Sequence, residues 1–414
     1  MMGEFEGLGF APAEILLPQG CELTKWAVVA CDQYTSQPEY WERVERFVGT
    51  APSSLRLVLP EGCLDGPDVE NDITEINTTM TRYLRGGQFR ALPDALIYVE
   101  RTLAGGAVRR GLVGAVDLEE YDYEEESGGL IRATEGTVLS RIPPRVAVRK
   151  NAPIELPHVM LLFDDREGCL LPHLTGEVEQ MEKLYDFDLM EESGHLTGWL
   201  LTEEQKRHVA ASLCRLKGTG EDAMLFAVGD GNHSLATAKE CYERQKRLTP
   251  PEKWAELPSR WALAEICNLH DHSLQFAPIH RVVFDVQPEE LLRAFRESLP
   301  PVEEGEGTPF PYQFGETVGT LHGLLPPHVL PVAALQNFLD DYLAQNGGRV
   351  DYIHGEETAR RLARRARTVA FFLPALDKYQ LFPAIRAGGT LPRKTFSVGQ
   401  AQDKRFYLEA RKIR

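Results

Sequence analysis

The sequence predicts an α/β fold in its mixed α+β form, and three observations lead to this prediction. Short apolar runs of strand length alternate with segments of helical periodicity along the whole chain. Turns that contain glycine or proline separate these segments. Hydrophobic residues make up 43% of the chain and charged residues 26%, as is usual for a globular protein with a buried core.

The N-terminal half contains five apolar runs that predict strands. They are 26–31, 55–60, 96–103, 111–118 and 158–165. Between them, 68–87 predicts a helix because Ile73, Ile76 and Met80 fall on one face and glycines end the segment. A second helix is expected around 38–47.

The C-terminal part repeats this alternation. It predicts a helix at 331–348, a strand at 349–355, a helix at 356–367, a strand at 368–376 and a helix at 378–389. Before it, Pro, Gly and Glu dominate 298–316, which predicts a linker. We therefore expect an N-terminal and central core at 1–297, the linker at 298–316 and a C-terminal α/β segment at 317–414.

Charge and composition exclude several classes of protein. The net charge of -17 argues against a nucleic-acid binder, which needs clustered Lys and Arg to neutralise phosphates. No apolar run is long enough to cross a membrane, and the N-terminus lacks the pattern of a signal peptide. The seven cysteines form no C-x-x-C pair, which is typical of free thiols in a reducing compartment. A cytoplasmic protein is expected.

The stretch 223-AMLFAVGDGNHSLATAKECYERQKR-247 is the main candidate for a functional site. Its apolar start predicts a central strand, and its second half predicts a helix. Gly229 and Gly231 permit positive φ or a close approach of a ligand. Asp230 and His233 would then lie at the N-terminus of a helix, where free N–H groups attract anions. There an aspartate can bind a metal or an amine, and a histidine can donate to a phosphate.

The same stretch has other interpretations. Asp-Gly-Asn can form only a tight turn that Asn232 or Ser234 caps. Metallophosphoesterases also carry Gly-Asn-His after a strand, but the Asp-x-His that they require is missing before Asp230. Sulfiredoxins carry Gly-Cys-His-Arg, whereas here Asn232 occupies the cysteine position and Cys241 lies about two turns away, so a thiol mechanism is not expected.

Four segments resemble, in order, the motifs of the bacterial and archaeal family called domain of unknown function 1015. They are 131-IRATEGTV-138, 230-DGNHSLATA-238, 278-PIHRVV-283 and 391-LPRKTF-396. The second is similar to that family's Asp-Gly-His-His-Arg, which also occurs in the ParB/sulfiredoxin-like superfamily. That superfamily includes ParB proteins, which bind CTP and DNA, and kinases of free L-serine. The resemblance therefore implies a ParB/sulfiredoxin-like core with an additional C-terminal α/β segment.

The resemblance also implies a nucleotide site at the turn formed by Gly229, Gly231, Asn232, His233 and Ser234. Ser234 replaces the family's phosphate-binding arginine, so either another cation supplies the charge or the turn binds no nucleotide. The candidate cations are Arg132, Arg141, Arg145, Arg281, Arg393 and Lys394.

Carboxylates complete the expected site. Asp32 follows a predicted strand at a place where family members tend to carry Pro-Tyr-Asp. In the serine-kinase relatives an N-terminal carboxylate acts as base on the serine hydroxyl, which implies this role for Asp32, with Glu135 as the alternative. Asp230 and His233 are the other candidate catalytic residues, and Asp230 is the candidate ligand of a metal ion.

The function expected from the resemblance is phosphoryl transfer from ATP or ADP, with Mg²⁺, to a small molecule that could be L-serine. Two other functions stay open. One is a regulator that binds a nucleotide or metabolite without turnover. The other is a hydrolase of phosphorylated or acylated metabolites. The sequence does not indicate the oligomeric state.

Overall fold

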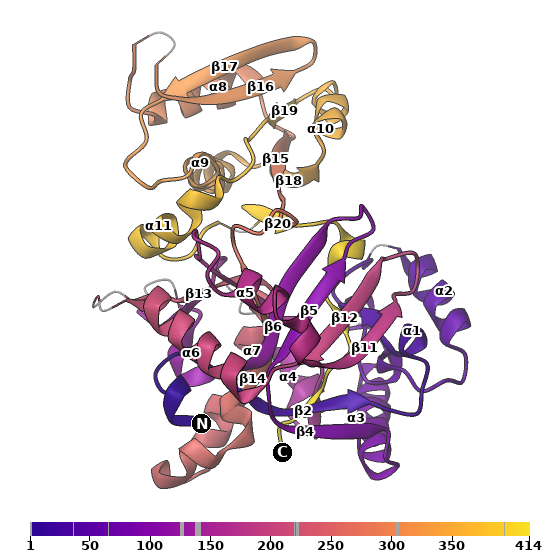
Figure 1. Ribbon diagram of the computed structural model, residues 1–414. Coiled ribbons are helices and arrows are strands. Elements are labelled where there is room, and N and C mark those ends of the chain that lie inside the picture. Colours follow the sequence, from indigo (N-terminus) through magenta and orange to yellow (C-terminus); the bar gives the residue numbers. More distant parts are fainter. Residues whose placement is uncertain are drawn as a thin grey trace. The chain divides into compact units, whose positions relative to one another are not determined.

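The computed structural model divides the chain into two compact units (Figure 1). The described residues are 2–35, 37–64, 66–124, 128–136, 142–218, 220, 223–303, 306–392 and 394–414. Unit 1 consists of Met1–Ala133, Thr137–Leu274 and Gly399–Arg414. Unit 2 consists of Thr134–Gly136 and Gln275–Val398. The chain thus returns to unit 1 for its last residues.

The described part of unit 1 is built on a ten-stranded mixed sheet with the order β11-β12-β5-β6-β14-β10-β13-β8-β7, and β1 pairs with β6. The strands are β1 (Phe10–Ala11), β5 (Ile97–Thr102), β6 (Val108–Asp117), β7 (Tyr121–Asp122), β8 (Ile131–Arg132), β10 (Met160–Phe163), β11 (Glu182–Asp188), β12 (His195–Leu200), β13 (Phe226–Asp230) and β14 (Trp261–Asn268). β13 lies between β10 and β8, and its first three residues are buried. This interior position explains its continuous apolar sequence.

Helices and short two-stranded sheets complete unit 1. The helices are α1 (Leu23–Trp26), α2 (Pro38–Val48), α3 (Val69–Arg85), α4 (Ile142–Arg149), α5 (Leu171–Thr175), α6 (Glu203–Lys217) and α7 (Asn232–Lys246). The paired strands are β2 (Ala13–Pro18) with β4 (Phe89–Ala95), β3 (Val28–Val29) with β21 (Phe406–Tyr407), and β9 (Ile154–Glu155) with β22 (Arg411–Lys412).

The C-terminal segment 399–414 is an internal part of unit 1. Phe406, Tyr407 and Leu408 are buried in the same hydrophobic cluster as Trp26 and Val28. The Trp26 indole N–H donates to the carbonyl of Leu408 at 3.2 Å. This segment therefore brings residues from the end of the sequence beside residues from its beginning.

Unit 2 contains a second sheet with the order β17-β16-β19-β15-β18, and β20 pairs with β15. The strands are β15 (Phe276–Phe284), β16 (Thr308–Phe314), β17 (Thr317–Gly323), β18 (Arg349–His354), β19 (Thr368–Phe371) and β20 (Phe396–Val398). The helices are α8 (Pro288–Ser298), α9 (Pro331–Asn346), α10 (Glu356–Ala363) and α11 (Lys378–Gly388).

The predicted mixed α/β class is confirmed, and the predicted helices appear as α2, α3, α9, α10 and α11. The strand predicted at 55–60 is wrong. Ser53 caps a 3-10 helix at Ser54–Arg56 by accepting the N–H of Leu55, and the buried side chains of Leu57 and Leu59 account for the apolar pattern. The stretch 298–316, predicted as a linker, includes strand β16. The ParB/sulfiredoxin-like core stays a prediction.

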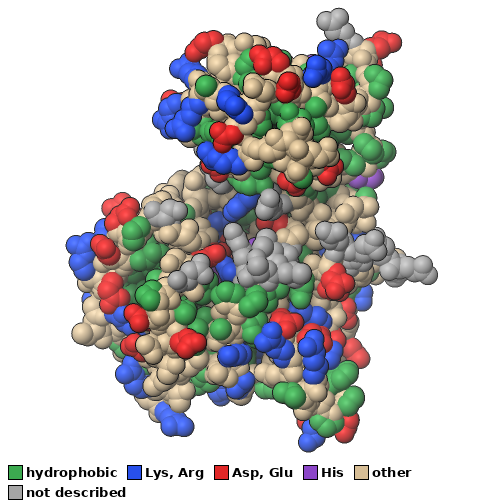
Figure 2. Space-filling view, turned by 180° about the vertical axis from the view of Figure 1, so that it is seen from behind, with side chains coloured by type: hydrophobic (Ala, Val, Ile, Leu, Met, Phe, Trp, Pro, Cys, Tyr) green, Lys and Arg blue, Asp and Glu red, His purple; other side chains and the backbone are tan. Residues whose placement is uncertain are grey.

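The described helices are all too short or too polar to cross a lipid bilayer. On the face shown in Figure 2, acidic and basic side chains are interspersed over the surface.

His195 makes the edge formed by β11 and β12 sensitive to pH. Its Nδ1 lies 2.7 Å from Asp188 and its Nε2 lies 2.6 Å from Asp186. These hydrogen bonds, that of Asp188 foremost, raise the pKa of His195. Because the pKa of His195 is raised in the folded state, the protonated ring stabilises the fold at every pH below its unfolded pKa near 6.5. This stabilisation disappears as the pH rises through the higher pKa of the folded state. Urea unfolding should show His195→Gln less stable than the native protein at about pH 5.5 and nearly equal to it at about pH 9.

Candidate functional site

The turn between β13 and α7 has the geometry that its two glycines predict. Gly231 adopts a left-handed conformation with φ of 83°, and a Cβ there would lie 3.1 Å from the Cα of Val159. A Cβ at Gly229 would lie 2.8 Å from the side chain of Leu162. Both positions therefore favour glycine, and α7 begins at Asn232 directly after β13 ends at Asp230. The N-terminus of a helix is the positive end of its dipole, which favours an anion there.

Replacing Gly231 by alanine is expected to destabilise the protein by about 1–3 kcal/mol, because left-handed strain adds to the contact with Val159. Gly87 is the matched control, since it also has a positive φ of 71° but a Cβ added there would have no atom within 4 Å. Urea unfolding should show a larger loss for Gly231→Ala than for Gly87→Ala. Equal losses would contradict the close approach of Val159.

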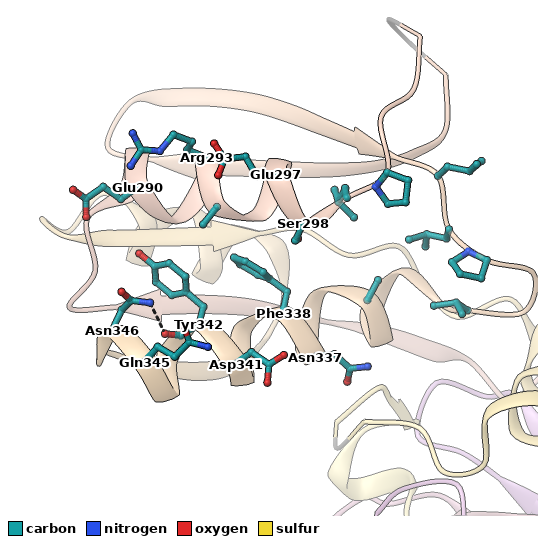
Figure 3. Close-up of a pocket in the computed structure, with 18 residues that line it drawn as sticks. Glu290, Arg293, Glu297, Ser298, Asn337, Phe338, Asp341, Tyr342, Gln345 and Asn346 are labelled. Atoms are coloured by element: carbon teal, nitrogen blue, oxygen red, sulfur yellow. Dashed lines mark hydrogen bonds between the residues drawn. The ribbon is translucent and has the colours of Figure 1, made fainter.

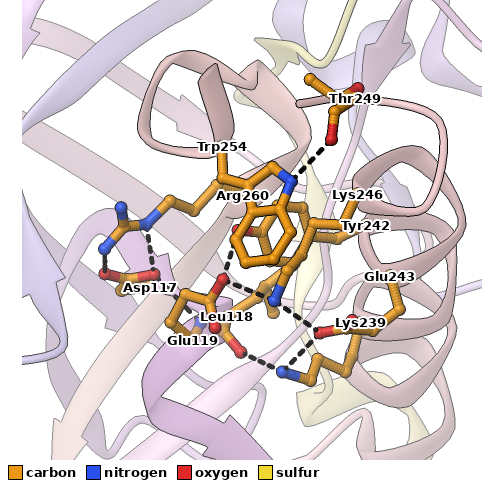
Figure 4. A network of polar contacts seen from close by, with 10 residues as sticks. All are labelled: Asp117, Leu118, Glu119, Lys239, Tyr242, Glu243, Lys246, Thr249, Trp254 and Arg260. Carbon is orange, nitrogen blue, oxygen red and sulfur yellow. Dashed lines mark hydrogen bonds and ion pairs between the residues drawn. The ribbon is translucent and has the colours of Figure 1, made fainter. Parts of the chain in front are cut away.

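A network of polar contacts fixes the C-terminal half of α7 (Figure 4). Glu119 accepts a hydrogen bond from Tyr242 at 2.5 Å and pairs with Lys246 at 2.8 Å. Lys239 donates to the carbonyl of Leu118 at 2.9 Å. The residues Leu235, Ala238 and Tyr242 also pack in the main core of unit 1. A helix that is held along its length can keep its N-terminus in a fixed place.

Asp230 forms an ion pair with the C-terminal segment. Its Oδ2 lies 3.2 Å from Nζ of Lys404, and both side chains are largely buried. Its Oδ1 accepts the N–H of Gly231 at 3.0 Å. Lys404 therefore places a positive charge directly at the end of β13, beside the N-terminus of α7.

Asp32 lies near the same place. Its Oδ2 is 3.8 Å from Nε2 of His158, and its Oδ1 accepts a hydrogen bond from Gln33 at 3.0 Å. Burial alone would raise the pKa of Asp32. The nearby His158, the hydrogen bond from Gln33 and the charge of Lys404 outweigh burial and lower that pKa below its ordinary value. Asp32 is therefore ionised at neutral pH.

His158 connects Asp32 with the turn. Its Nε2 lies 3.2 Å from Oγ of Ser234, and its Nδ1 lies 2.7 Å from the hydroxyl of Tyr407. The Tyr407 hydroxyl accepts the N–H of Cys31 and donates to the sulfur of Cys31, both at 3.1 Å. Because its single proton is used there, Tyr407 accepts from Nδ1–H of His158, which leaves Nε2 without a proton in the neutral ring.

The thiol of Cys31 is a poor nucleophile in this place. Burial and the charge of Asp32 raise the pKa of Cys31 to about 12. With this pKa, almost no thiolate is present at neutral pH, and only the thiolate attacks electrophiles. Cys31 therefore serves as a hydrogen-bond partner of Tyr407.

The structure thus brings together Asp32, Asp230 and Ser234 from the predicted site. His233 and Asn232 lie in the first turn of α7, and the carbonyl of His233 accepts from Thr237 at 2.7 Å. Sequence reasoning missed His158, Lys404 and Tyr407, which come from the start of a predicted strand and from the C-terminal segment. His158 stands directly before the apolar run 159–163, and this strand-end position was the one available signal.

Three other predicted residues meet inside unit 2. Oε1 of Glu135 accepts the N–H of Lys394 at 3.0 Å, and the carbonyl of Lys394 accepts from Arg281 at 3.0 Å. Arg281 is completely buried and also donates to Gln336 at 3.0 Å. Three of the four motifs that resemble the family therefore meet in one place, and the nucleotide role of these residues stays a prediction.

The remaining candidate cations have separate positions. Arg132 is buried on β8, beside β13, and donates to the carbonyl of Gly129 at 3.2 Å. Arg145 pairs with Glu61 at 2.7 Å. Arg141 and Arg393 lie outside the described residues.

Unit 2 also contains a pocket of about 760 Å³ between α8 and α9 (Figure 3). Phe338 and Tyr342 point from α9 toward α8. Leu324 and Val329, from the segment between β17 and α9, also line the pocket. None of the predicted site residues lines this pocket.

Comparison with solved structures finds matches of low identity and low TM-score. A conserved hypothetical protein from Pyrococcus furiosus is 11% identical with a TM-score of 0.37, and the match covers 70% of this chain and 92% of that one. A free serine kinase in complex with AMP is 12% identical with a TM-score of 0.39, covering 72% and 91%. A C-terminally truncated SbnI from Staphylococcus aureus is 11% identical with a TM-score of 0.36, covering 69% and 82%.

No curated protein matches the chain. A family model does match, over residues 14–379, and its description is "Protein of unknown function (DUF1015)". The match covers most of the 414 residues and includes the β13–α7 turn, Asp32 and His158. The chain therefore belongs to this family, the same one that its four motifs resemble.

Proposed function

We propose that the protein transfers a phosphoryl group from ATP or ADP to the hydroxyl of a small molecule, with L-serine as the first candidate. One observation carries the proposal: the ionised carboxylate of Asp32 and the ammonium group of Lys404 lie beside the same helix N-terminus. Phosphoryl transfer requires a base for the acceptor hydroxyl and positive charge around the moving phosphoryl group. The N-terminus of a helix, at the positive end of its dipole, is a suitable place for the phosphates.

In this proposal Lys404 supplies the charge that the family's arginine would provide at position 234. Its pairing with Asp230 keeps it at the end of β13. The N–H groups of the first turn of α7 and the side chain of His233 would contact the nucleotide phosphates. Arg132, Glu135, Arg281 and Lys394 are not needed for these steps.

The residues of this place fit Mg²⁺ that arrives bound to a nucleotide. Among the described residues no three His, Cys, Asp or Glu side chains form a cluster that could hold a metal ion. Mg²⁺ bound to a nucleotide needs only one or two protein carboxylates, because phosphates and water supply its other ligands. Asp230 would be its ligand, with Asp32 as the neighbouring carboxylate, and the ion would neutralise phosphate charge.

The proposed transfer involves the acceptor hydroxyl, the nucleotide and Asp32 as the base. The acceptor hydroxyl loses its proton to Asp32, and its oxygen forms a bond to the terminal phosphorus. The bond from that phosphorus to the bridging oxygen of the nucleotide breaks, and the shortened nucleotide leaves with the electron pair.

Mass spectrometry tests this proposal. The protein is incubated with Mg²⁺, ATP or ADP, and a mixture of the twenty amino acids. A phosphorylated serine, lost in Asp230→Ala, would support the assignment. Unchanged nucleotide binding in both Asp230→Ala and His233→Ala, measured by calorimetry, would exclude the turn as the nucleotide site.

One observation favours hydrolysis as a second candidate function. Ser234, His158 and Tyr407 form a chain of hydrogen bonds in which Nε2 of His158 can accept the proton of the serine hydroxyl. A nucleophile, its base and a group that orients the base are the usual parts of covalent catalysis. A fluorophosphonate probe should then label Ser234, and Ser234→Ala should abolish the labelling. An unlabelled native protein would remove this candidate.

A further inference from the structure

A second pocket, of about 800 Å³, lies directly beside the Asp32 segment in unit 1. Its walls are α2, the residues that follow Asp32, and the loop around Pro60. Its lining includes the aromatic residues Tyr34 and Trp41 and the charged residues Glu42 and Arg46. A pocket of this volume is within the usual range for small molecules and is far larger than serine requires.

The pocket is close to the proposed base. Tyr34 follows Asp32 by two residues, and two residues of chain span at most about 7 Å. The N–H of Glu61 donates to the carbonyl of Cys31 at 2.8 Å, so the loop around Pro60 is attached to the residue before Asp32. A molecule in this pocket would therefore lie next to the segment that carries Asp32, although the Asp32 side chain is not part of the wall.

Two aromatic side chains of the pocket are fixed in place. Tyr34 has a positive φ of 55°, and its ring stacks on Tyr40 with the centroids 3.8 Å apart. The indole N–H of Trp41 donates to the carbonyl of Gln33 at 3.3 Å. A left-handed conformation is costly for a tyrosine, and such strain is common where a side chain is held for a ligand.

Three charged side chains of α2 line the pocket, namely Glu42, Glu45 and Arg46. Glu42 and Arg46 have the spacing at which an ion pair is usual. Within the described residues neither is in an ion pair, and Nε of Arg46 donates instead to the backbone carbonyl of Glu42 at 3.3 Å. Glu45, also in the wall, is already bound by Arg56 through two contacts of 2.7 and 2.6 Å.

We propose that this pocket binds the phosphoryl acceptor, and that it also accepts zwitterionic amino-acid compounds larger than L-serine, the first candidate. Glu42 would bind the ammonium group of such a compound and Arg46 its carboxylate, while Tyr34 and Trp41 contact an apolar or aromatic part. That the bound compound is a phosphoryl acceptor rests on the proposed function. The binding itself depends only on the pocket.

Calorimetry without nucleotide tests the binding. The probe is the dipeptide L-seryl-L-phenylalanine, compared with its N-acetyl and its C-terminal amide derivatives. The native protein should bind each blocked derivative about tenfold or more weakly, because each has lost one charged contact. Glu42→Gln should no longer distinguish the acetylated peptide from the free one, and Arg46→Gln should no longer distinguish the amide.

Glu39→Gln is the matched control, since Glu39 is exposed on the same helix and does not line the pocket. It should bind all three peptides as the native protein does. Equal binding of free and blocked peptides, or the same loss in Glu39→Gln as in Glu42→Gln, would overturn the proposal.

The two proposals fail in different ways. Selective binding of the free dipeptide with no phosphorylated product would keep the pocket assignment and count against the phosphotransferase. Phosphorylation of serine by a protein that binds neither the dipeptide nor its derivatives would overturn the pocket assignment alone.

Discussion

The variant Asp32→Asn is expected to lose phosphoryl transfer by about 100- to 10,000-fold, the usual contribution of a general base. The asparagine has nearly the same shape and can still accept the hydrogen bond of Gln33, but it cannot take a proton. Nucleotide binding should change little, because the phosphates are proposed to contact α7 and Lys404. The measurement is the initial rate of product formation together with the dissociation constant for the nucleotide.

The control for Asp32→Asn is Asp164→Asn, another aspartate of unit 1 that pairs with a histidine, His270, at 2.6 Å. This control should retain the rate. A rate for Asp32→Asn within a few-fold of the native rate would remove Asp32 as the base.

The pH dependence of the transfer rate follows from the lowered pKa of Asp32. The pKa of Asp32 lies below its ordinary value of 3.8, so the carboxylate is the ionised base at every pH above that region. Its contribution to stability is also present above the unfolded pKa and is lost only as the pH falls through the folded value. The rate should therefore show no acidic limb from Asp32 between about pH 5 and 8. Such a limb, absent in Asp32→Asn, would mean that the carboxylate is less stabilised than the contacts with His158 and Lys404 imply.

Local patterns predicted local structure well. The apolar run before Gly229, the two glycines and the helical spacing after Ser234 were sufficient for the β13–α7 turn. Asp32 was predicted as a strand-end residue for a related reason, since it follows an apolar run that contains β3. In both cases the signal and the structure involve neighbouring residues.

The residues of the candidate site that the sequence did not indicate reach it through contacts between parts that are far apart in the chain. Lys404 reaches Asp230, and Tyr407 reaches Cys31 and His158, only because the C-terminal segment returns to unit 1. A single sequence has no local pattern for such a return. For the same reason, continuous domains were expected, whereas both compact units are discontinuous in sequence.

Arg405 is expected to be the residue of the C-terminal segment on which the stability of unit 1 depends most. Its guanidinium group donates to Glu265 at 2.9 Å and to Glu409 at 2.7 Å, and all three side chains are buried. Removing one partner of a buried ion pair typically costs about 3–5 kcal/mol, because the other charge remains buried without compensation. Arg405→Met should therefore lower the free energy of unfolding by an amount in this range.

Urea denaturation compares Arg405→Met with Lys412→Met, whose partner Glu14 lies 2.9 Å away with both side chains about half exposed. An exposed pair is worth about 0–1 kcal/mol, so the control should unfold almost as the native protein does.

The same two variants also test the candidate nucleotide site, because Lys404 is the neighbour of Arg405 in the chain. If the buried ion pairs hold the segment in place, Arg405→Met should weaken nucleotide binding under conditions where it is still folded, and Lys412→Met should not. A destabilised variant with undiminished nucleotide binding would separate the two roles, and Lys404 would then have to be held by its pairing with Asp230 alone.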